Sequence, residues 1–188
     1  MTAASRRHKT ADRVAGERGE TARLHRLLRV DQAGEFGATR IYAGQLAVLR
    51  RKSCAPVIQE MAQQEDEHLS RFDDLMRRHH VRPTALRPLW HVAGFALGAA
   101  TALLGERAAM ACTAAVEEEI DQHYARQIRS LENPKSDLGR LLEKFRQDES
   151  QHRATALAHG AEQAPAWPLL RRAIRAGTRA AIALSERV

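Results

Sequence analysis

The segment Ile58–Leu75, with the sequence IQEMAQQEDEHLSRFDDL, places ionisable side chains where a helix normally carries apolar ones. Its apolar residues recur at helical spacing, and Glu65 and His68 lie on the same stripe as those residues. A later segment repeats the arrangement with Glu149 and His152. Because a stripe with a period of 3.6 residues faces the protein core, both Glu-x-x-His pairs are predicted to point inward.

Two further acidic residues lie singly on apolar stripes. Glu35 belongs to a helix predicted over residues 21–51, and Glu117 belongs to one predicted over residues 106–131. The other predicted helices span residues 56–80, 89–105, 136–159 and 166–187. No stretch of useful length alternates with a period of two, so the sequence predicts an all-α fold.

The spacing of these acidic residues indicates an internal repeat. Glu35 and Glu65 are 30 residues apart, and Glu117 and Glu149 are 32 residues apart. The midpoint of each interval lies at or beside a proline-containing break between helices. Residues equidistant from the turn of an antiparallel hairpin lie at the same height. Each hairpin is therefore predicted to place a single Glu opposite a Glu-x-x-His pair, with pseudo-twofold symmetry between the hairpins.

Four inward carboxylates require neutralisation, because burying an isolated carboxylate costs at least several kcal/mol. A structural ion-pair network with arginine could neutralise one or two of them. Four carboxylates and two imidazoles at one level suit two divalent first-row metal ions better. The predicted metal ligands are Glu35, Glu65, His68, Glu117, Glu149 and His152. This combination is the ligand pattern of ferritin-like di-iron proteins.

Other polar residues near these stripes have more modest predicted roles. Asp31 and Asp121 lie one turn from the single glutamates and are predicted to orient ligands through hydrogen bonds. Glu118 and Glu119 point away from the stripe and are predicted to be solvated. Tyr124 faces inward, where it either lines a cavity beside the metals or fills the core.

Composition and charge constrain the partners and the compartment. The chain has 188 residues, a net charge of +7 and only 4% aromatic residues, which favours a helical protein. The positive charge attracts nucleic acid or anionic lipid without choosing between them. Two isolated cysteines predict free thiols in a reducing compartment. Residues 1–20 are predicted to form a flexible, solvated tail, with a mitochondrial presequence as the alternative, and residues 21–188 a single domain.

Several motifs resemble those of a known family. They are Asp31-Gln32-Ala33-Gly34-Glu35-Phe36-Gly37-Ala38, Gln64–Leu69, Phe95–Ala99, Leu103–Gly105, Met110–Thr113 and Leu184–Arg187. In this order they are similar to the demethoxyubiquinone hydroxylases of ubiquinone biosynthesis (the Coq7 family), from about Arg26 to the C-terminus. The six ligands of that family match the six residues selected by the stripes. The chain departs from the family pattern at a few positions. Gln32 and Phe36 stand where the family often has His and Tyr, and Ser150-Gln151 replaces a more acidic pair. None of these differences removes a ligand.

The resemblance implies a ferritin-like four-helix bundle that acts as a monooxygenase on a polyprenylated methoxy-benzoquinone, demethoxyubiquinone. It implies two iron ions, O2 as co-substrate, and electrons from NADH or another external reductant. Four residues resemble family positions near the path of the quinone or reductant: Arg26, His123, Tyr124 and Arg179. Of these, His123 and Tyr124 are the predicted catalytic residues, and Arg26 and Arg179 are predicted to bind the cofactor. The family analogy also allows a lipid-presenting helical partner protein and a homo-oligomer.

A substrate with a long apolar tail resides in a bilayer, so we expect contact with a membrane lipid surface. The uncharged run Leu89–Gly105 is short for a span, which needs about 20 residues. It is expected either as an interfacial helix with Trp90 at the headgroup level or as a buried packing helix. The arginine-rich helix over 166–187 suits an anionic lipid surface or an ordinary solvated face.

These features predict a peripheral protein on the cytoplasmic face of a bacterial inner membrane, with the matrix face of the mitochondrial inner membrane as the alternative. Two other classes of protein fit less well. A ferroxidase or manganese catalase needs no apolar surface segment. A basic helical nucleic-acid-binding module would have no use for inward Glu-x-x-His pairs, so no nucleic-acid partner is expected.

Overall fold

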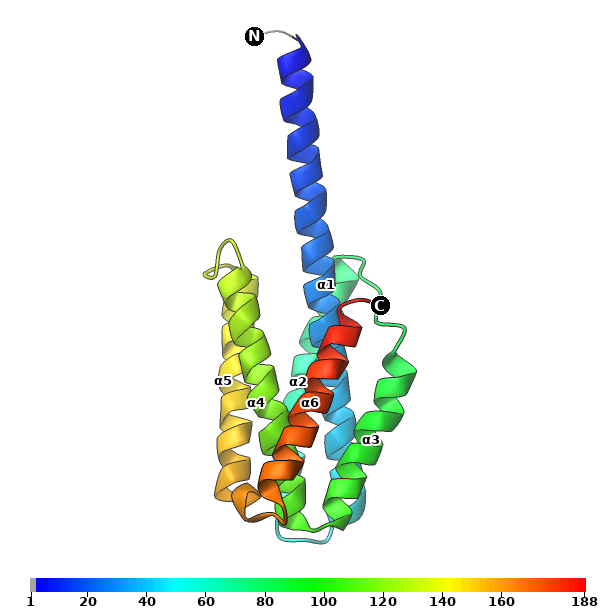
Figure 1. The fold of residues 1–188 in the computed structure, drawn as a ribbon, viewed down its shortest axis with the longest axis vertical. Helices are drawn as coiled ribbons and strands as arrows, with labels where there is room; N and C mark the ends of the chain where they lie inside the picture. Colours follow the sequence, from blue (N-terminus) through cyan, green and yellow to red (C-terminus); the bar gives the residue numbers. More distant parts are fainter. Residues whose placement is uncertain (1–2) are drawn as a thin grey trace.

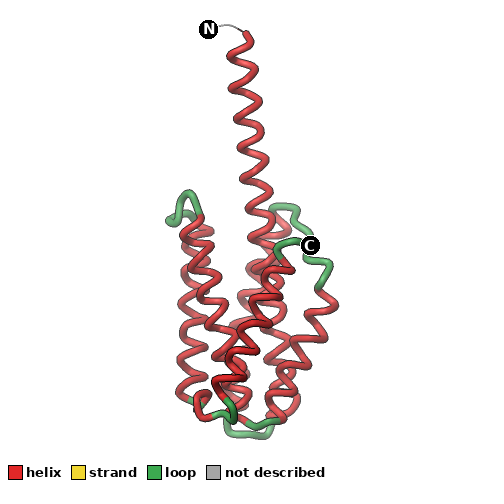
Figure 2. Tube along the Cα trace, viewed as in Figure 1, coloured by secondary structure: helices red, strands yellow, loops and turns green. Residues whose placement is uncertain are grey.

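The chain consists of helices joined by short loops throughout residues 3–188, the part that the computed structural model describes, with side chains described from Gly19 onward. The elements are α1 (Ala3–Leu49), α2 (Ala55–Arg78), α3 (Arg87–Leu103), α4 (Glu106–Ser130), α5 (Asp137–Ala158), the 3-10 helix η1 (Ala161–Gln163) and α6 (Trp167–Ser185). Figure 2 shows no strand within these residues. The predicted all-α fold is confirmed.

Four of the helices form a bundle of two antiparallel hairpins. Helix α1 packs against α2, and α4 packs against α5 (Figure 1). Helix α3 lies along the outside of α1, and α6 lies along the outside of α4. The structure therefore has the predicted four-helix bundle with additional α3 and C-terminal helices.

Helix α1 begins earlier than the sequence pattern predicts. We expect a helix from about Thr21, but α1 starts at Ala3, and its first part extends beyond the other helices (Figure 1). No proline interrupts residues 3–49, and this stretch is rich in Ala and Arg, which favour helix. The division into a flexible tail and a domain at residue 20 stays a prediction.

The helix boundaries follow local chemistry. Pro56 occupies the first turn of α2, where its missing N–H is not needed. The Ser136 hydroxyl caps α5 by accepting a hydrogen bond from the Gly139 amide at 3.1 Å. Gly160, with a φ of 84°, follows α5 in the left-handed conformation that ends many helices. These are the breaks that the sequence predicts.

The bundle core contains two apolar clusters separated by a polar layer. One cluster includes Ile58 and Met110, and the other includes Phe72 and Leu142. On each bundle helix, the acidic residues of interest lie between the residues of these two clusters. The polar layer is therefore sealed from water along the bundle axis.

Helix α3 packs through one face only. A Cβ atom at Gly98 would lie 1.9 Å from the Ile41 carbonyl oxygen, and one at Gly44 would lie 2.2 Å from the Phe95 carbonyl oxygen. Glycines at these positions allow the backbones of α1 and α3 to touch. The opposite face of α3 is exposed, with Val92 65% accessible. No helix within residues 3–188 combines the length and apolarity needed to cross a bilayer.

Candidate metal centre

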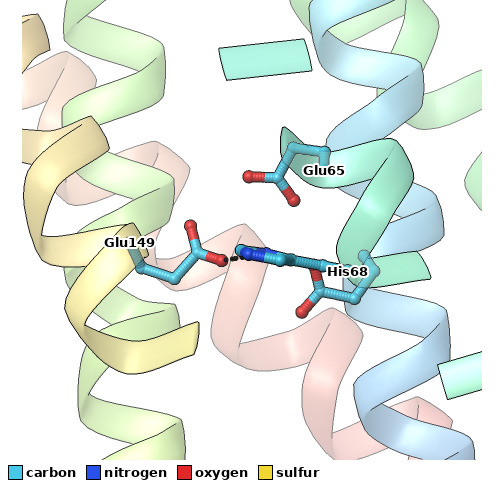
Figure 3. Close-up of side chains that lie close together, drawn as sticks. Glu65, His68 and Glu149 are labelled. Carbon is cyan, nitrogen blue, oxygen red and sulfur yellow. Dashed lines mark hydrogen bonds and ion pairs between the residues drawn. The ribbon is translucent and has the colours of Figure 1, made fainter. Parts of the chain in front are cut away.

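The structure brings all six predicted ligand side chains together in the polar layer of the bundle. Their nitrogen and oxygen atoms form two groups, and within each group these atoms lie within 4.8 Å of one another. One group is Glu35, Glu65, His68 and Glu149, and the other is Glu65, Glu117, Glu149 and His152. All six side chains are buried. Glu65 and Glu149 belong to both groups and point toward one another from α2 and α5 (Figure 3).

Each histidine directs its Nδ1 atom at the carboxylates. The His68 Nδ1 lies 3.1 Å from the Glu149 Oε1 and 3.5 Å from the Glu35 Oε2. The His152 Nδ1 lies 3.1 Å from the Glu149 Oε2 and 3.1 Å from the Glu65 Oε1. Glu149 therefore lies between the two imidazoles, one oxygen facing each ring.

The outer nitrogen of each imidazole bonds to the opposite helix. The His68 Nε2 donates to the Asp148 Oδ2 at 3.1 Å, and the His152 Nε2 donates to the Gln64 Oε1 at 2.5 Å. A proton held on Nε2 leaves the Nδ1 lone pair free to bind a metal. Gln64 and Asp148 immediately precede the shared glutamates. The sequence pattern alone predicted no role for them. Their position directly before a glutamate of each Glu-x-x-His pair is a signal that could have identified them.

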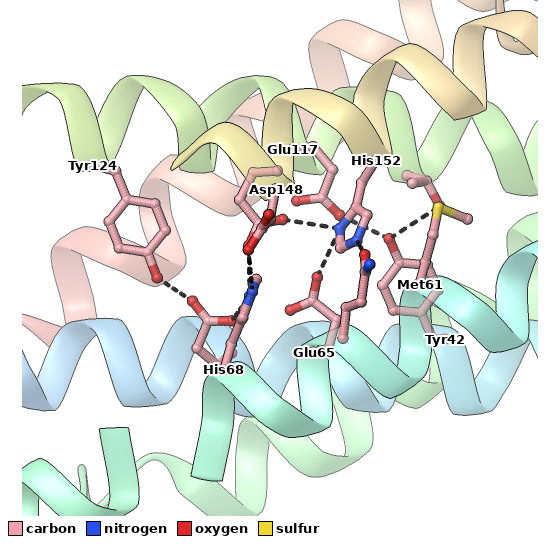
Figure 4. A network of polar contacts seen from close by, with 12 residues as sticks. Tyr42, Met61, Glu65, His68, Glu117, Tyr124, Asp148 and His152 are labelled. Atoms are coloured by element: carbon pink, nitrogen blue, oxygen red, sulfur yellow. Dashed lines mark hydrogen bonds and ion pairs between the residues drawn. The ribbon is translucent and has the colours of Figure 1, made fainter. Parts of the chain in front are cut away.

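Two tyrosines donate to the single glutamates in a reciprocal way. The Tyr42 hydroxyl of α1 donates to the Glu117 Oε1 of α4 at 3.0 Å. The Tyr124 hydroxyl of α4 donates to Glu35 of α1. Each tyrosine follows the single glutamate of its own helix by seven residues. The pseudo-twofold repeat thus extends to the hydrogen bonds, and Tyr124 lies in the core directly beside the cluster (Figure 4).

The cluster carries more acid than its own bases can neutralise. Burial, together with the neighbouring carboxylates, raises the pKa of Glu65 and of Glu117 well above the usual value for Glu. Burial also opposes ionisation of Glu149, but hydrogen bonds from His152 and His68 hold its pKa at about 2. Burial disfavours the charged form of His68, yet its bonds to Glu149 and Glu35 raise its pKa to about 10.

The donor set fits two divalent cations. Within the described part of the chain, Glu35, Glu65 and Glu149 form ion pairs with histidines, and none of the four glutamates pairs with Lys or Arg. The buried Glu35 Oε2 and Glu65 Oε1 atoms accept no hydrogen bond from the described residues. Carboxylate and imidazole donors suit first-row divalent metals, and shared carboxylates suit a pair of them. Each of the two groups could therefore hold a metal ion, and Glu65 and Glu149 are available to both groups.

His123 is held by Asp31, which lies one helix turn before Glu35 on α1. Its Nε2 donates to the Asp31 Oδ1 at 3.1 Å, and Gln127 donates to the same oxygen at 2.6 Å. Asp31 therefore positions the ring next in sequence to Tyr124. The prediction that Asp121 orients a ligand is wrong, because its carboxylate is partly exposed and pairs with Arg146 at 3.3 Å.

The prediction that Glu118 and Glu119 are solvated is also wrong. Both are buried where α6 covers the outer face of α4. Arg171 donates to the Glu118 Oε2 at 2.7 Å, and Arg175 lies 2.8 Å from the Glu118 Oε1. Arg179 donates to the Glu119 Oε1 at 2.7 Å. The predicted role of Arg179 near a reductant or quinone must therefore be compatible with its pairing to Glu119.

An apolar cavity of about 340 Å³ lies between α1, α3, α4 and α6. Gly34 and Val116, which line it, precede the glutamates Glu35 and Glu117 in sequence. Trp90 and Ser185 line the cavity as well, and the indole Nε1 donates to the hydroxyl at 3.0 Å, which links α3 to α6. Trp90 thus faces this cavity. Of the predicted site residues, Arg26 is exposed on α1.

A four-helix bundle whose core holds two Glu-x-x-His pairs and two single glutamates defines the ferritin-like class, with a cluster able to hold two metal ions. The family described as "Ubiquinone biosynthesis protein COQ7" matches residues 22–185. The chain belongs to this family.

Curated relatives are similar over most of their length. The "3-demethoxyubiquinol 3-hydroxylase" of Rhodospirillum rubrum is 54% identical over 186 residues, which cover 98% of this chain and 88% of the relative. The human "NADPH-dependent 3-demethoxyubiquinone 3-hydroxylase, mitochondrial" is 56% identical over 171 residues, 89% of this chain and 79% of the relative. The "5-demethoxyubiquinone hydroxylase, mitochondrial" of Saccharomyces cerevisiae is 40% identical over 186 residues, which cover 90% of this chain and 80% of the relative.

Proposed function

We propose that this chain is a di-iron monooxygenase that hydroxylates the ring of demethoxyubiquinone, a polyprenylated methoxy-benzoquinone, in ubiquinone biosynthesis. The observation that carries the proposal is the pair of overlapping carboxylate–histidine groups that share Glu65 and Glu149. The printed names of the relatives support the substrate class. The ligands are the six residues Glu35, Glu65, His68, Glu117, Glu149 and His152.

The proposed reaction inserts one oxygen atom of O2 into a ring C–H bond and releases the other as water. The balance requires two electrons and two protons from outside. We assign the two electrons and one proton to a hydride of NADH or NADPH, and the second proton to solvent. Two bound iron ions would supply the redox chemistry with O2. The chain itself supplies a water-excluding core, and the Tyr42 and Tyr124 hydroxyls hold protons beside Glu117 and Glu35. His123 beside Tyr124 is proposed to take part in delivering protons or electrons.

The apolar cavity is the proposed site for the quinone ring and the first part of its tail. Its lining is almost entirely aliphatic and glycyl, as an isoprenoid chain requires. Gly34 and Val116 bring the cavity wall to the helix positions adjacent to Glu35 and Glu117. A ring bound at this wall would lie next to the metal cluster, while the tail could leave between α3 and α6.

A lipid-facing surface surrounds this exit. Within the described part of the chain, every exposed large hydrophobic side chain lies on α3, on α6 or just after one of them. These residues are Leu89, Val92, Phe95, Leu103, Leu104, Leu169, Leu184 and Val188. Exposed apolar residues gathered beside arginines favour an anionic membrane surface. We propose peripheral binding at the cytoplasmic face of a bacterial inner membrane, with the mitochondrial matrix face as the alternative.

The hydroxylase proposal is tested by turnover with labelled oxygen. The iron-loaded chain is incubated with a short-tailed demethoxyquinone, 18O2, and NADH or NADPH in parallel. We expect a hydroxylated quinone that contains one 18O atom, detected by mass spectrometry. Oxidation of Fe(II) or breakdown of peroxide without any quinone product would indicate a ferroxidase or a catalase instead.

The lipid-facing surface is tested by sedimentation with vesicles. We expect the chain to bind vesicles of phosphatidylcholine mixed with anionic phosphatidylglycerol more strongly than phosphatidylcholine alone. The double variant Val92→Ser, Leu103→Ser should weaken this binding, because both side chains are exposed and apolar. A matched change at the exposed Glu60 of α2, Glu60→Ser, should leave it unchanged. Equal binding by both variants would contradict the proposed surface.

A further inference from the structure

The two halves of the metal centre are similar but not identical. Each half has a single glutamate, a tyrosine donor from the opposite hairpin, and a histidine whose Nδ1 faces the shared Glu149. The halves differ in the group that accepts the outer imidazole proton. That group is the carboxylate of Asp148 for His68 and the neutral amide of Gln64 for His152.

This difference acts on the metal through the imidazole ring. A carboxylate that accepts the outer N–H of a ligating histidine makes the ring a stronger donor, and loss of such a partner typically lowers metal affinity about 10- to 100-fold. The Asp148 side chain is only 31% exposed, so water screens its charge incompletely. A neutral amide orients the ring of His152 without adding negative charge.

We propose that the two metal positions are unequal, and that the position of His68 binds a divalent ion more tightly than the position of His152. Asp148 and Gln64 are the positioning residues that create this difference. The inference rests on the proposed metal centre, but it does not depend on the substrate. Its consequence is an order of loading, with the first ion bound by Glu35 and His68.

Variants that retain one histidine separate the two positions. His152→Ala leaves the position of His68, and His68→Ala leaves the position of His152. Each metal-free variant is titrated with Co(II), and binding is followed by the visible absorption of the bound ion. We expect Co(II) to bind at least about tenfold more tightly to His152→Ala than to His68→Ala. Equal affinities, or the reverse order, would overturn the proposal.

Exchanging the outer partners assigns the cause. Asp148→Asn added to His152→Ala should weaken Co(II) binding about tenfold, and Gln64→Glu added to His68→Ala should tighten it several-fold. Asp148→Asn added to His68→Ala is the matched control and should change the affinity less than about twofold, because no imidazole then bonds to residue 148. An equal effect of Asp148→Asn in both backgrounds would show that the charge of Asp148 acts without the His68 imidazole. That result would overturn the assignment of the difference to the Asp148–His68 hydrogen bond.

The intact ligand set provides a second readout. The chain loaded with 57Fe(II) should show two distinct Mössbauer quadrupole doublets, and Asp148→Asn should shift one of them toward the other. Two doublets that are unchanged in Asp148→Asn would overturn the assignment to Asp148. Failure of the chain to bind either Co(II) or Fe(II) would instead contradict the metal centre itself, whereas two equal positions would contradict only the inequality.

Discussion

Helix α4 carries three consecutive glutamates that are all buried but have different kinds of partner. Glu117 points into the bundle, where a tyrosine hydroxyl is its hydrogen-bond donor and where it shares a group with two other carboxylates and one histidine. Glu118 and Glu119 point outward, where guanidinium groups of α6 accompany them. The charges beside Glu118 and Glu119 are balanced within the chain, and those of the inner cluster are not.

Glu118 and Glu119 therefore hold two helices together, whereas Glu117 belongs to a cluster that is suited to bind a cation. A buried carboxylate paired with arginine contributes to packing, and its removal leaves an uncompensated cation. A buried carboxylate among other carboxylates destabilises the metal-free fold. Binding of a cation offsets this unfavourable free energy. Substitutions at these glutamates and at their hydrogen-bond donors distinguish the two roles.

The largest effect is expected from Glu149→Gln, which removes a carboxylate that faces both histidines. We expect the bound iron to be lost and hydroxylation of the demethoxyquinone to fall to background, because both metal positions depend on this residue. Mass spectrometry of the product and elemental analysis of iron check the result. The matched control is Glu119→Gln, an equally buried glutamate, and a similar loss of iron in that variant would break the comparison.

Glu119→Gln, which should not affect iron binding, is expected to lower the stability of the protein. Glu119→Gln leaves Arg175 and Arg179 without a carboxylate partner at this position. We expect the free energy of unfolding of the metal-loaded protein to fall by about 1 to 2 kcal/mol, because Glu119 is buried but Arg179 is half exposed and Arg175 keeps Glu118 as a partner. Urea denaturation measures this change. A loss below about 0.5 kcal/mol would indicate that the arginines of α6 contribute nothing measurable to packing.

The stability of the metal-free protein should depend on pH because of the inner carboxylates. The pKa values of Glu65 and Glu117 are raised well above 4.5 by burial and by their carboxylate neighbours, so the folded state keeps protons that the unfolded state releases. Stability must therefore fall as pH rises above 4.5. Each such proton contributes a slope of at most about 1.4 kcal/mol per pH unit.

Thermal or urea unfolding of the metal-free protein between about pH 5 and pH 9 measures this slope. Glu65→Gln should make it shallower, because one retained proton is removed. Bound metal should abolish most of the slope, since the ligands are then ionised in the folded state. Metal-free stability that rises over this range would contradict the raised pKa values.

The smallest effects are expected at the two tyrosines. Tyr42→Phe and Tyr124→Phe each remove one hydrogen bond from a tyrosine hydroxyl to a glutamate that bound metal would also hold in place. We expect each change to lower the free energy of unfolding of the metal-loaded protein by about 1 kcal/mol. Unequal losses, measured by urea denaturation, would show that the pseudo-twofold repeat does not extend to the energetics of these bonds.

The sequence pattern was sufficient for the helices and for the gathering of the six inner residues. Glu35 and Glu117 could be placed opposite Glu65 and Glu149 because the hairpin arithmetic requires only a helical period and a turn position. The contacts of Tyr42, by contrast, depend on the register between the two hairpins. That register is a property of the packed bundle and cannot be read from any single helix.

Glu118 and Glu119 illustrate the limit of a stripe argument. A hydrophobic stripe describes one buried face of one helix, but α4 is buried on two faces because α6 packs along its outer side. The arginines of α6 looked like a solvated or lipid-facing set because their partners lie more than 50 residues earlier in the chain. Long-range ion pairs of this kind leave no periodic signal in the sequence.

The proposed function requires that the inner carboxylates hold two metal ions. The most direct test is the iron content of the purified chain, loaded anaerobically with Fe(II) and freed of excess metal, beside Glu149→Gln and Glu119→Gln prepared in the same way. We predict two iron ions per chain in the wild type and in Glu119→Gln, and almost none in Glu149→Gln. A wild-type chain that hydroxylates the quinone without bound metal, or a Glu149→Gln variant that keeps both ions, would contradict the account.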